Sequence, residues 1–262
     1  MINHEFKKKF GQNFISDKNL LNAICEDAEV GKDDEVLEIG AGAGTLTSAI
    51  SSRAKKVVSY EIDTSLQEHL LELELENTKF IFGDVMNFDL EEIEKDFSGE
   101  YKMIANLPYY ITTPIIFKFL NNSKKIKSLT IMVQKEVAER IVAGVGGKDY
   151  GVLSIMTSFY GDAEINRIVS RKMFYPQPNV DSAVVTIKIN REKYKNINSD
   201  EFYNFIKSAF SMRRKTLKNN LTHSGIEKSK IQKINEEILA KRAENFDIDQ
   251  LLEIYLKIFK VF

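Results

Sequence analysis

Short apolar runs alternate with helical patterns along the first half of the chain. Five largely apolar runs have the length of strands and lie at residues 35–39, 56–60, 79–82, 101–105 and 129–133. Apolar residues recur at the spacing of an α-helix between them, most clearly at residues 17–30, 66–76 and 115–120. Regular alternation of strands and helices predicts an α/β fold with a mostly parallel, doubly wound sheet that continues to about residue 142.

The pattern changes twice in the second half. Residues 164–169 and 180–189 alternate between apolar and polar positions, which predicts an antiparallel pair of strands around a loop with two prolines. A polar stretch at 190–200 then leads into helical patterns only, at residues 202–212, 214–221, 231–239 and 248–259. We therefore predict two domains, an α/β domain over residues 1–190 and a small all-α domain over residues 191–262.

Three predicted strands end in residues suited to binding a nucleoside. The first strand runs into a turn with Gly40, Gly42 and Gly44, where the backbone can approach a ligand closely at the start of a helix. The second ends at Glu61, which can accept from two ribose hydroxyls, and the third at Asp84, which can accept from an adenine amino group. The carboxyl ends of parallel strands share one sheet edge, so these residues predict one site. The alternative is a plain βαβ sheet whose acids only cap helices.

The fourth strand ends in Asn106-Leu107-Pro108-Tyr109, a sequence suited to holding a planar amine. The Asn106 carbonyl can accept from an exocyclic N–H, Pro108 fixes the backbone, and Tyr109 offers a ring on which a base can stack. Hydrogen bonds accepted from an amino group draw its delocalised lone pair toward a tetrahedral nitrogen, which can attack a methyl donor. Taken alone, the segment could also be an ordinary turn.

Composition narrows the classes of function. The 262 residues are 43% apolar, enough for one sizeable domain and a small second one. No apolar run reaches the about 18 residues of a membrane span, and the start lacks the apolar core of a signal peptide. The chain has one cysteine, Cys25, and three scattered histidines, so we expect no internal disulfide and no metal site. These features predict a cytoplasmic protein without membrane contact.

The net charge of −1 conceals an uneven distribution. Residues 64–100 contain eleven acids and two lysines, so the remainder of the chain carries a net charge of +8. Basic clusters lie at residues 7–9, 124–127 and 207–218, the last with five basic residues and no acid. Any one such cluster is ordinarily a solvated face. Three clusters beside an amine-binding motif favour contact with RNA phosphates.

Together, the glycine turn, Glu61, Asp84 and the Asn-Leu-Pro-Tyr sequence resemble the class I S-adenosylmethionine-dependent amino-methyltransferases, and more closely the ribosomal RNA adenine dimethyltransferases. The resemblance runs nearly from end to end through five strings in the family's order, at residues 9–14, 106–114, 132–140, 174–183 and 209–217. Within the family, Leu107 and the strings at 112–114 and 213–217 favour the dimethyladenosine transferases of small-subunit RNA over the macrolide-resistance type, which modifies large-subunit RNA.

The resemblance implies a Rossmann-like, mostly parallel sheet of seven strands with the last antiparallel, and a helical C-terminal domain that contributes to RNA binding. It implies binding of S-adenosylmethionine by Gln12, Asn13, Ile15, Gly40, Gly42, Gly44, Glu61, Asp84 and Asn106. It implies that the target adenine is held by Asn106, Leu107, Pro108, Tyr109 and Phe174. It is consistent with RNA binding by Arg213, Arg214, Lys215 and Lys218.

The implied activity is methyl transfer to N6 of two adjacent adenosines in the 3′-terminal hairpin loop of small-subunit RNA, within an assembling 30S particle, by a monomer. The macrolide-resistance activity is the first alternative. A non-catalytic assembly or transcription factor on the same fold is the second, but the glycine turn, Glu61, Asp84 and Asn106 are intact. DNA adenine methylation is the third, and those enzymes usually have Asp or Ser before Pro-Pro-Tyr or Pro-Pro-Phe.

Overall fold

The computed structural model describes residues 14–108 and 111–259, which form two compact units. One, here called the sheet unit, holds the described residues up to Ala138 together with Ala163–Ile189. The other, the helical unit, holds Glu139–Asp162 and the described residues from Asn190 onward. Three predicted site residues lie outside the described residues, namely Gln12, Asn13 and Tyr109.

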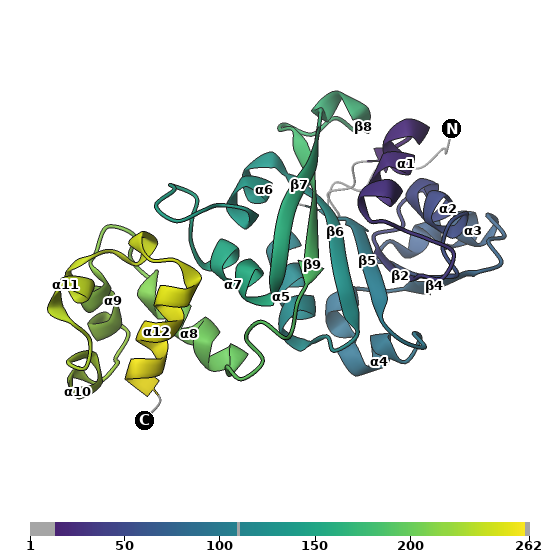
Figure 1. The fold of residues 1–262 in the computed structure, drawn as a ribbon. Helices are drawn as coiled ribbons and strands as arrows, with labels where there is room; N and C mark the ends of the chain where they lie inside the picture. Colours follow the sequence, from purple (N-terminus) through teal and green to yellow (C-terminus); the bar gives the residue numbers. More distant parts are fainter. Residues whose placement is uncertain (1–13, 109–110, 260–262) are drawn as a thin grey trace. The chain divides into compact units, whose positions relative to one another are not determined.

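A seven-stranded sheet organises the sheet unit (Figure 1). Its strands follow the order β4 (Thr78–Phe82), β3 (Lys56–Glu61), β2 (Glu35–Ile39), β5 (Tyr101–Asn106), β6 (Ile126–Gln134), β9 (Ser182–Ile189) and β7 (Gly161–Val169). The strands from β4 to β6 pair in parallel, whereas β9 runs antiparallel to β6. The predicted α/β fold with seven strands is confirmed. The order of the strands reverses between β2 and β5, where a ligand crevice is expected at their carboxyl ends.

Helices cover the sheet, so residues on both faces of its central strands are buried. All five residues of β2 are buried. On one face, residues of α1 (Lys18–Asp27) and α2 (Thr45–Ser51) share an apolar cluster with residues of β2, β3, β5, β6 and β9. Asp17 caps α1, because its carboxylate accepts a 2.9 Å hydrogen bond from the backbone N–H of Leu20.

The remaining helical segments of this unit are η2 (Thr64–Leu66), α3 (Gln67–Leu71), η3 (Val85–Asn87), α4 (Leu90–Glu94), α5 (Thr112–Asn122) and, between β7 and β9, η4 (Arg171–Met173). The boundary between the two units falls within α6 (Lys135–Ile141). The prediction of a helix to residue 76 was wrong, since α3 ends at Leu71 and Glu74 has a φ of 49°. The apolar pattern continues beyond the end of α3 because Leu73 packs against Leu66, Leu70 and Ala41 beside the glycine turn.

A second, two-stranded sheet joins the start of the described chain to the loop between β7 and β9. β1 (Phe14–Ile15) pairs antiparallel with β8 (Phe174–Tyr175), and Ile15 lies opposite Phe174. Strands of two residues have no periodicity that sequence analysis could detect. The pairing brings Ile15 and Phe174, two predicted site residues far apart in the sequence, to one place.

The helical unit contains α7 (Val152–Tyr160), α8 (Ser199–Ala209), α9 (Leu217–His223), α10 (Lys228–Ile231), α11 (Glu236–Ala240), η5 (Ala243–Asn245) and α12 (Ile248–Phe259). The pattern at 231–239 predicted one helix, but Asn235 starts a new one by accepting a hydrogen bond from Glu237 N. None of the helices in the described part of the chain is long and apolar enough to cross a membrane.

The structure places residues 139–162 in the helical unit, whereas the predicted domain boundary placed them in the first domain. The reason is the packing of α7, whose Phe159 ring lies 5.1 Å from that of Phe202 in α8. Tyr150, just before α7, donates a 3.0 Å hydrogen bond to the carbonyl of Phe246. The apolar pattern of α7 predicts a buried helix but does not indicate which elements bury it.

Candidate active site

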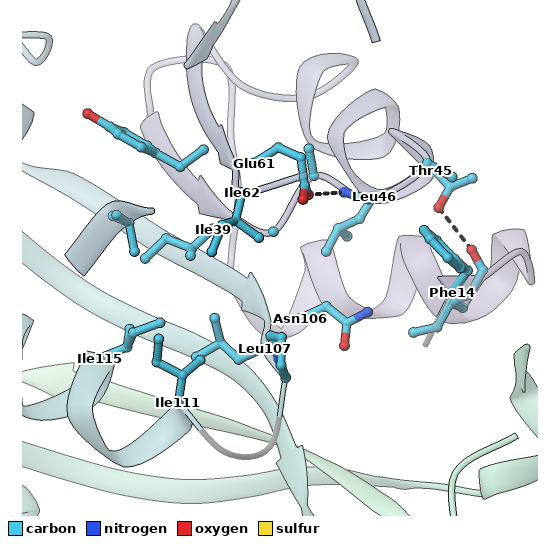
Figure 2. A pocket seen from close by; sticks show the side chains of 18 of the residues that line it. Phe14, Ile39, Thr45, Leu46, Glu61, Ile62, Asn106, Leu107, Ile111 and Ile115 are labelled. Carbon is cyan, nitrogen blue, oxygen red and sulfur yellow. Dashed lines mark hydrogen bonds between the residues drawn. The ribbon is translucent and has the colours of Figure 1, made fainter. Parts of the chain in front are cut away.

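The carboxyl ends of four parallel strands, β2, β3, β4 and β5, open into one pocket (Figure 2). Of the predicted site residues, those that line it are Ile15, Gly40, Gly42, Glu61, Asp84, Asn106, Leu107, Pro108 and Phe174. Gly44 does not line the pocket and is instead the N-cap of α2. The structure therefore brings together residues that the sequence predicted from six separate segments.

The glycine turn needs residues without side chains. Gly44 has a φ of 75°, and a Cβ atom there would lie 2.3 Å from Cδ1 of Leu73. Gly42 has a φ of 54°, and its Cβ would lie 3.1 Å from the ring of Phe14. The turn therefore presents bare backbone to the pocket, directly before the N-terminus of α2.

Glu61 ties the end of β3 to the glycine turn. Its Oε2 accepts a 2.8 Å hydrogen bond from Gly42 N, and its Oε1 accepts one of 2.8 Å from Asp63 N. The side chain is buried, and burial raises the pKa of Glu61 although both backbone donors act in the opposite direction. Each carboxylate oxygen can accept more than one hydrogen bond, so Glu61 retains acceptors for a ligand while it fixes the turn.

Asp84 lies at the end of β4 and begins the 3₁₀ turn η3. Its Oδ1 accepts a 2.9 Å hydrogen bond from Met86 N. Among the described residues, no hydrogen-bond donor contacts Oδ2. The ring of Phe88, which follows η3, meets the ring of Tyr60 edge-on with centroids 5.3 Å apart. Asp84 is thus held by a short ordered loop and keeps one oxygen for a ligand.

The segment after β5 carries the residues that were predicted to bind the target amine. Asn106 is half-buried and Leu107 is buried, and both line the pocket. In the view of Figure 2, the Asn106 side chain lies across the pocket from Glu61. The Pro108 carbonyl accepts from Ile111 N at 3.1 Å and from the Thr112 hydroxyl at 3.4 Å, which fixes this segment to the start of α5.

The small β1–β8 sheet forms another wall of the pocket. Phe174 is 5% exposed and lines the pocket, whereas its neighbour Tyr175 is 69% exposed, because successive side chains of a strand point in opposite directions. The hydroxyl of Thr45 in α2 donates a 2.9 Å hydrogen bond to the Ile15 carbonyl, as Figure 2 shows. This bond fixes β1 beside the glycine turn.

One acidic residue behind the pocket was not predicted to have any role. Glu38 lies inside β2 and is fully buried. Its Oε2 accepts a 2.6 Å hydrogen bond from the Ser59 hydroxyl, and its Oε1 has no partner among the described residues. Burial raises the pKa of Glu38 to about 7, opposed by the hydrogen bond from the Ser59 hydroxyl and helped by the nearby charge of Glu61. The signal in the sequence that could have identified Glu38 was a glutamate within a five-residue buried strand.

The residues predicted to bind RNA lie in the helical unit. Arg213, Arg214, Lys215 and Lys218 are all exposed. Arg213 donates to the carbonyl of Lys148, and Lys218 forms a 3.0 Å ion pair with Glu236. Within the described chain, Arg214 and Lys215 have no ion-pair partner. Their contact with RNA stays a prediction.

Residues 3–259 match the sequence profile of the family described as Ribosomal RNA adenine dimethylase. The chain belongs to this family. It is 41% identical over 257 residues to Ribosomal RNA small subunit methyltransferase A of Clostridioides difficile, covering 95% of this chain and 89% of the relative. It is 42% identical over 262 residues to the protein of the same name from Fusobacterium nucleatum, covering 97% of each chain.

Solved structures agree with this assignment. A dimethyladenosine transferase from Plasmodium falciparum superimposes with a TM-score of 0.78 at 27% identity, covering 92% of this chain and 95% of that one. The 23S rRNA methyltransferase ErmE gives 0.69 at 23% identity, covering 94% and 99%, and so shows the same fold. The predicted family is confirmed, and the protein is an S-adenosylmethionine-dependent rRNA adenine dimethyltransferase.

Proposed function

We propose that this protein dimethylates N6 of two adjacent adenosines in the 3′-terminal hairpin loop of small-subunit rRNA. One observation carries the proposal. The nucleoside-binding strand ends of β2, β3 and β4 and the amine-binding segment Asn106–Pro108 line the same pocket. The names of the relatives from C. difficile and F. nucleatum support the small subunit as the substrate.

The residues present fit S-adenosylmethionine, which supplies an electrophilic methyl group on a sulfonium. The bare backbone of Gly40 and Gly42 leaves room that a Cβ atom would fill, and the turn lies before a helix N-terminus. Glu61 has acceptors left for ribose hydroxyls, and Asp84 has Oδ2 left for an adenine amino group. Ile15 closes the pocket from the β1 side.

The chain's own residues hold the second substrate by its amino group and its ring. The Asn106 carbonyl accepts from the N6 amino group, as does the Leu107 carbonyl, while the Phe174 ring packs on one face of the base. Tyr109, outside the described residues, is assigned to the other face. Stacking offsets part of the few kcal/mol needed to take a base out of its stack.

Positioning, rather than a strong base, carries the reaction. No lysine or histidine is among the described residues that line the pocket, and a solvent acceptor suffices for the proton that each transfer releases. After one transfer the nitrogen keeps one N–H, and Asn106 can hold it for a second. A second transfer on the same nitrogen is therefore compatible with a single site.

We propose that the protein acts as a cytoplasmic monomer on an assembling 30S particle, and that Arg213, Arg214, Lys215 and Lys218 contact RNA phosphates. The test is to incubate the protein with labelled S-adenosylmethionine and with 30S or 50S particles that lack these methyl groups. Label on two adjacent adenosines near the 3′ end of the small-subunit RNA is expected. Label on large-subunit RNA would contradict the proposal and support the macrolide-resistance activity.

A further inference from the structure

Lys118 lies outside the pocket but reaches the loop that carries Asp84. It belongs to α5, the helix that follows the amine-binding segment. Its Nζ donates to the backbone carbonyls of Val85 at 2.9 Å, Met86 at 3.1 Å and Phe88 at 2.5 Å. An ammonium group has three N–H donors, and here each has an acceptor. These three carbonyls belong to η3 and to the residue that ends it.

The turn η3 supplies few donors for the carbonyls that Lys118 contacts, because it is a single turn. The last carbonyls of a helical segment have no partner within it, and a cation nearby stabilises them. Lys118 is half-buried, and burial lowers its pKa while the carboxylates of Asp89 and Asp84 act in the opposite direction. An ammonium in this place donates to three backbone carbonyls, of which that of Val85 also accepts a long hydrogen bond, of 3.4 Å, from Phe88 N.

Met86 links Lys118 to Asp84. Its N–H donates to Oδ1 of Asp84, and its carbonyl accepts from Lys118. The same loop is held on its other side by the Phe88 ring, which packs on Tyr60 and would lie 3.1 Å from a Cβ atom on Gly83. The orientation of the Asp84 carboxylate therefore depends on a turn whose last carbonyls are fixed from α5.

We propose that Lys118 is a positioning residue for the adenine ring of the cofactor. It holds η3 so that Oδ2 of Asp84 faces the adenine amino group, and it joins the cofactor loop to the helix that begins at the amine-binding segment. This inference rests on the cofactor site of the proposed function. It concerns a residue that touches neither substrate and acts through Asp84.

The test compares two ligands in a thermodynamic cycle. Calorimetry gives the dissociation constants of S-adenosylhomocysteine and of its analogue with purine in place of adenine, which lacks the amino group. The ratio of the two constants measures recognition of that group, and a hydrogen bond to a charged acceptor predicts a ratio of about ten or more for the wild type. Lys118→Met should lower this ratio by about threefold or more, because the acceptor remains but is no longer fixed.

Lys125→Met is the matched control. Lys125 also donates to two backbone carbonyls, those of Glu94 at 3.0 Å and Phe97 at 2.9 Å, and does not line the pocket. Its loss should leave the ratio unchanged even if stability falls. Lys118→Gln keeps one donor group and should give an intermediate ratio, so it carries the test if the Met variant does not fold.

The outcomes separate the inference from the site on which it rests. A wild type that binds both ligands equally would contradict the contact between Asp84 and adenine, and the role of Lys118 with it. If the wild type discriminates between the two ligands and the Lys118→Met and Lys118→Gln variants discriminate equally well, the role of Lys118 is contradicted and the cofactor site stands. A loss of affinity equal for both ligands would show a merely structural role and overturn the inference.

Discussion

Glu38→Gln should make the protein more stable at alkaline pH. The carboxyl is fully buried in β2, and burial raises its pKa from an ordinary 4.5 to about 7. A raised pKa means that the folded state holds the proton more tightly than the unfolded state does. The resulting stabilisation is present below about pH 4.5 and is lost as the pH rises through about 7. Glutamine has the shape of the neutral acid and does not titrate.

The magnitude follows from the shift. A change of one pKa unit corresponds to 1.36 kcal/mol, so the difference between 4.5 and about 7 gives about 3 kcal/mol, most of which falls between pH 5 and pH 8. Glutamine can still accept the hydrogen bond from Ser59 through its carbonyl oxygen. The stability of the Gln variant relative to the wild type should therefore rise by about 2 to 3 kcal/mol over this range.

Guanidinium unfolding of both proteins at pH 5, 6, 7 and 8 measures the difference. Glu35→Gln is the control on the same strand. Burial raises the pKa of Glu35, but hydrogen bonds from Ser98 outweigh it and the pKa lies below the ordinary value. Its effect on stability should therefore be constant above about pH 5. A difference between the Glu38 variant and the wild type that does not change with pH would refute the assignment of a neutral buried carboxyl.

Two further predictions concern ligands. Glu61→Ala should raise the dissociation constant of S-adenosylmethionine about tenfold or more, because a charge-assisted hydrogen bond contributes about 1.5–3 kcal/mol. The substitution also removes the hydrogen bond from Gly42 N that fixes the glycine turn. An unchanged affinity in calorimetry would contradict the place of Glu61 in the cofactor site. Replacing Arg213, Arg214 and Lys215 by Ala should weaken binding to 30S particles and flatten the dependence of log affinity on log salt by roughly 0.7–0.9 for each phosphate that is no longer neutralised. Binding measured between about 50 and 200 mM salt tests this, and an unchanged slope would place the RNA surface elsewhere.

The strands of the sheet could be predicted because periodicity and length mark a buried parallel strand. The glycine turn, Glu61, Asp84 and Asn106 followed from their positions at strand ends, since the fold brings those ends together.

What could not be predicted depends on contacts between distant residues. Lys118 reaches a loop about thirty residues earlier in the chain, and nothing in its own segment indicates that. The two-residue strands β1 and β8 have no detectable pattern, although their pairing places Ile15 beside Phe174. The place of residues 139–162 in the helical unit depends on which helices α7 packs against, and an apolar pattern does not encode the partner.

Asn106→Ala tests the central claim most directly, that one pocket binds the cofactor through its strand ends and holds the target nitrogen through Asn106. Cofactor affinity by calorimetry and methyl transfer to 30S particles should be measured on the same preparation. The account predicts affinity within a few-fold of the wild type and a loss of transfer of roughly 10²–10³, the typical cost of one preorganised polar group. Transfer above about a tenth of the wild-type rate, with the cofactor bound normally, would contradict it.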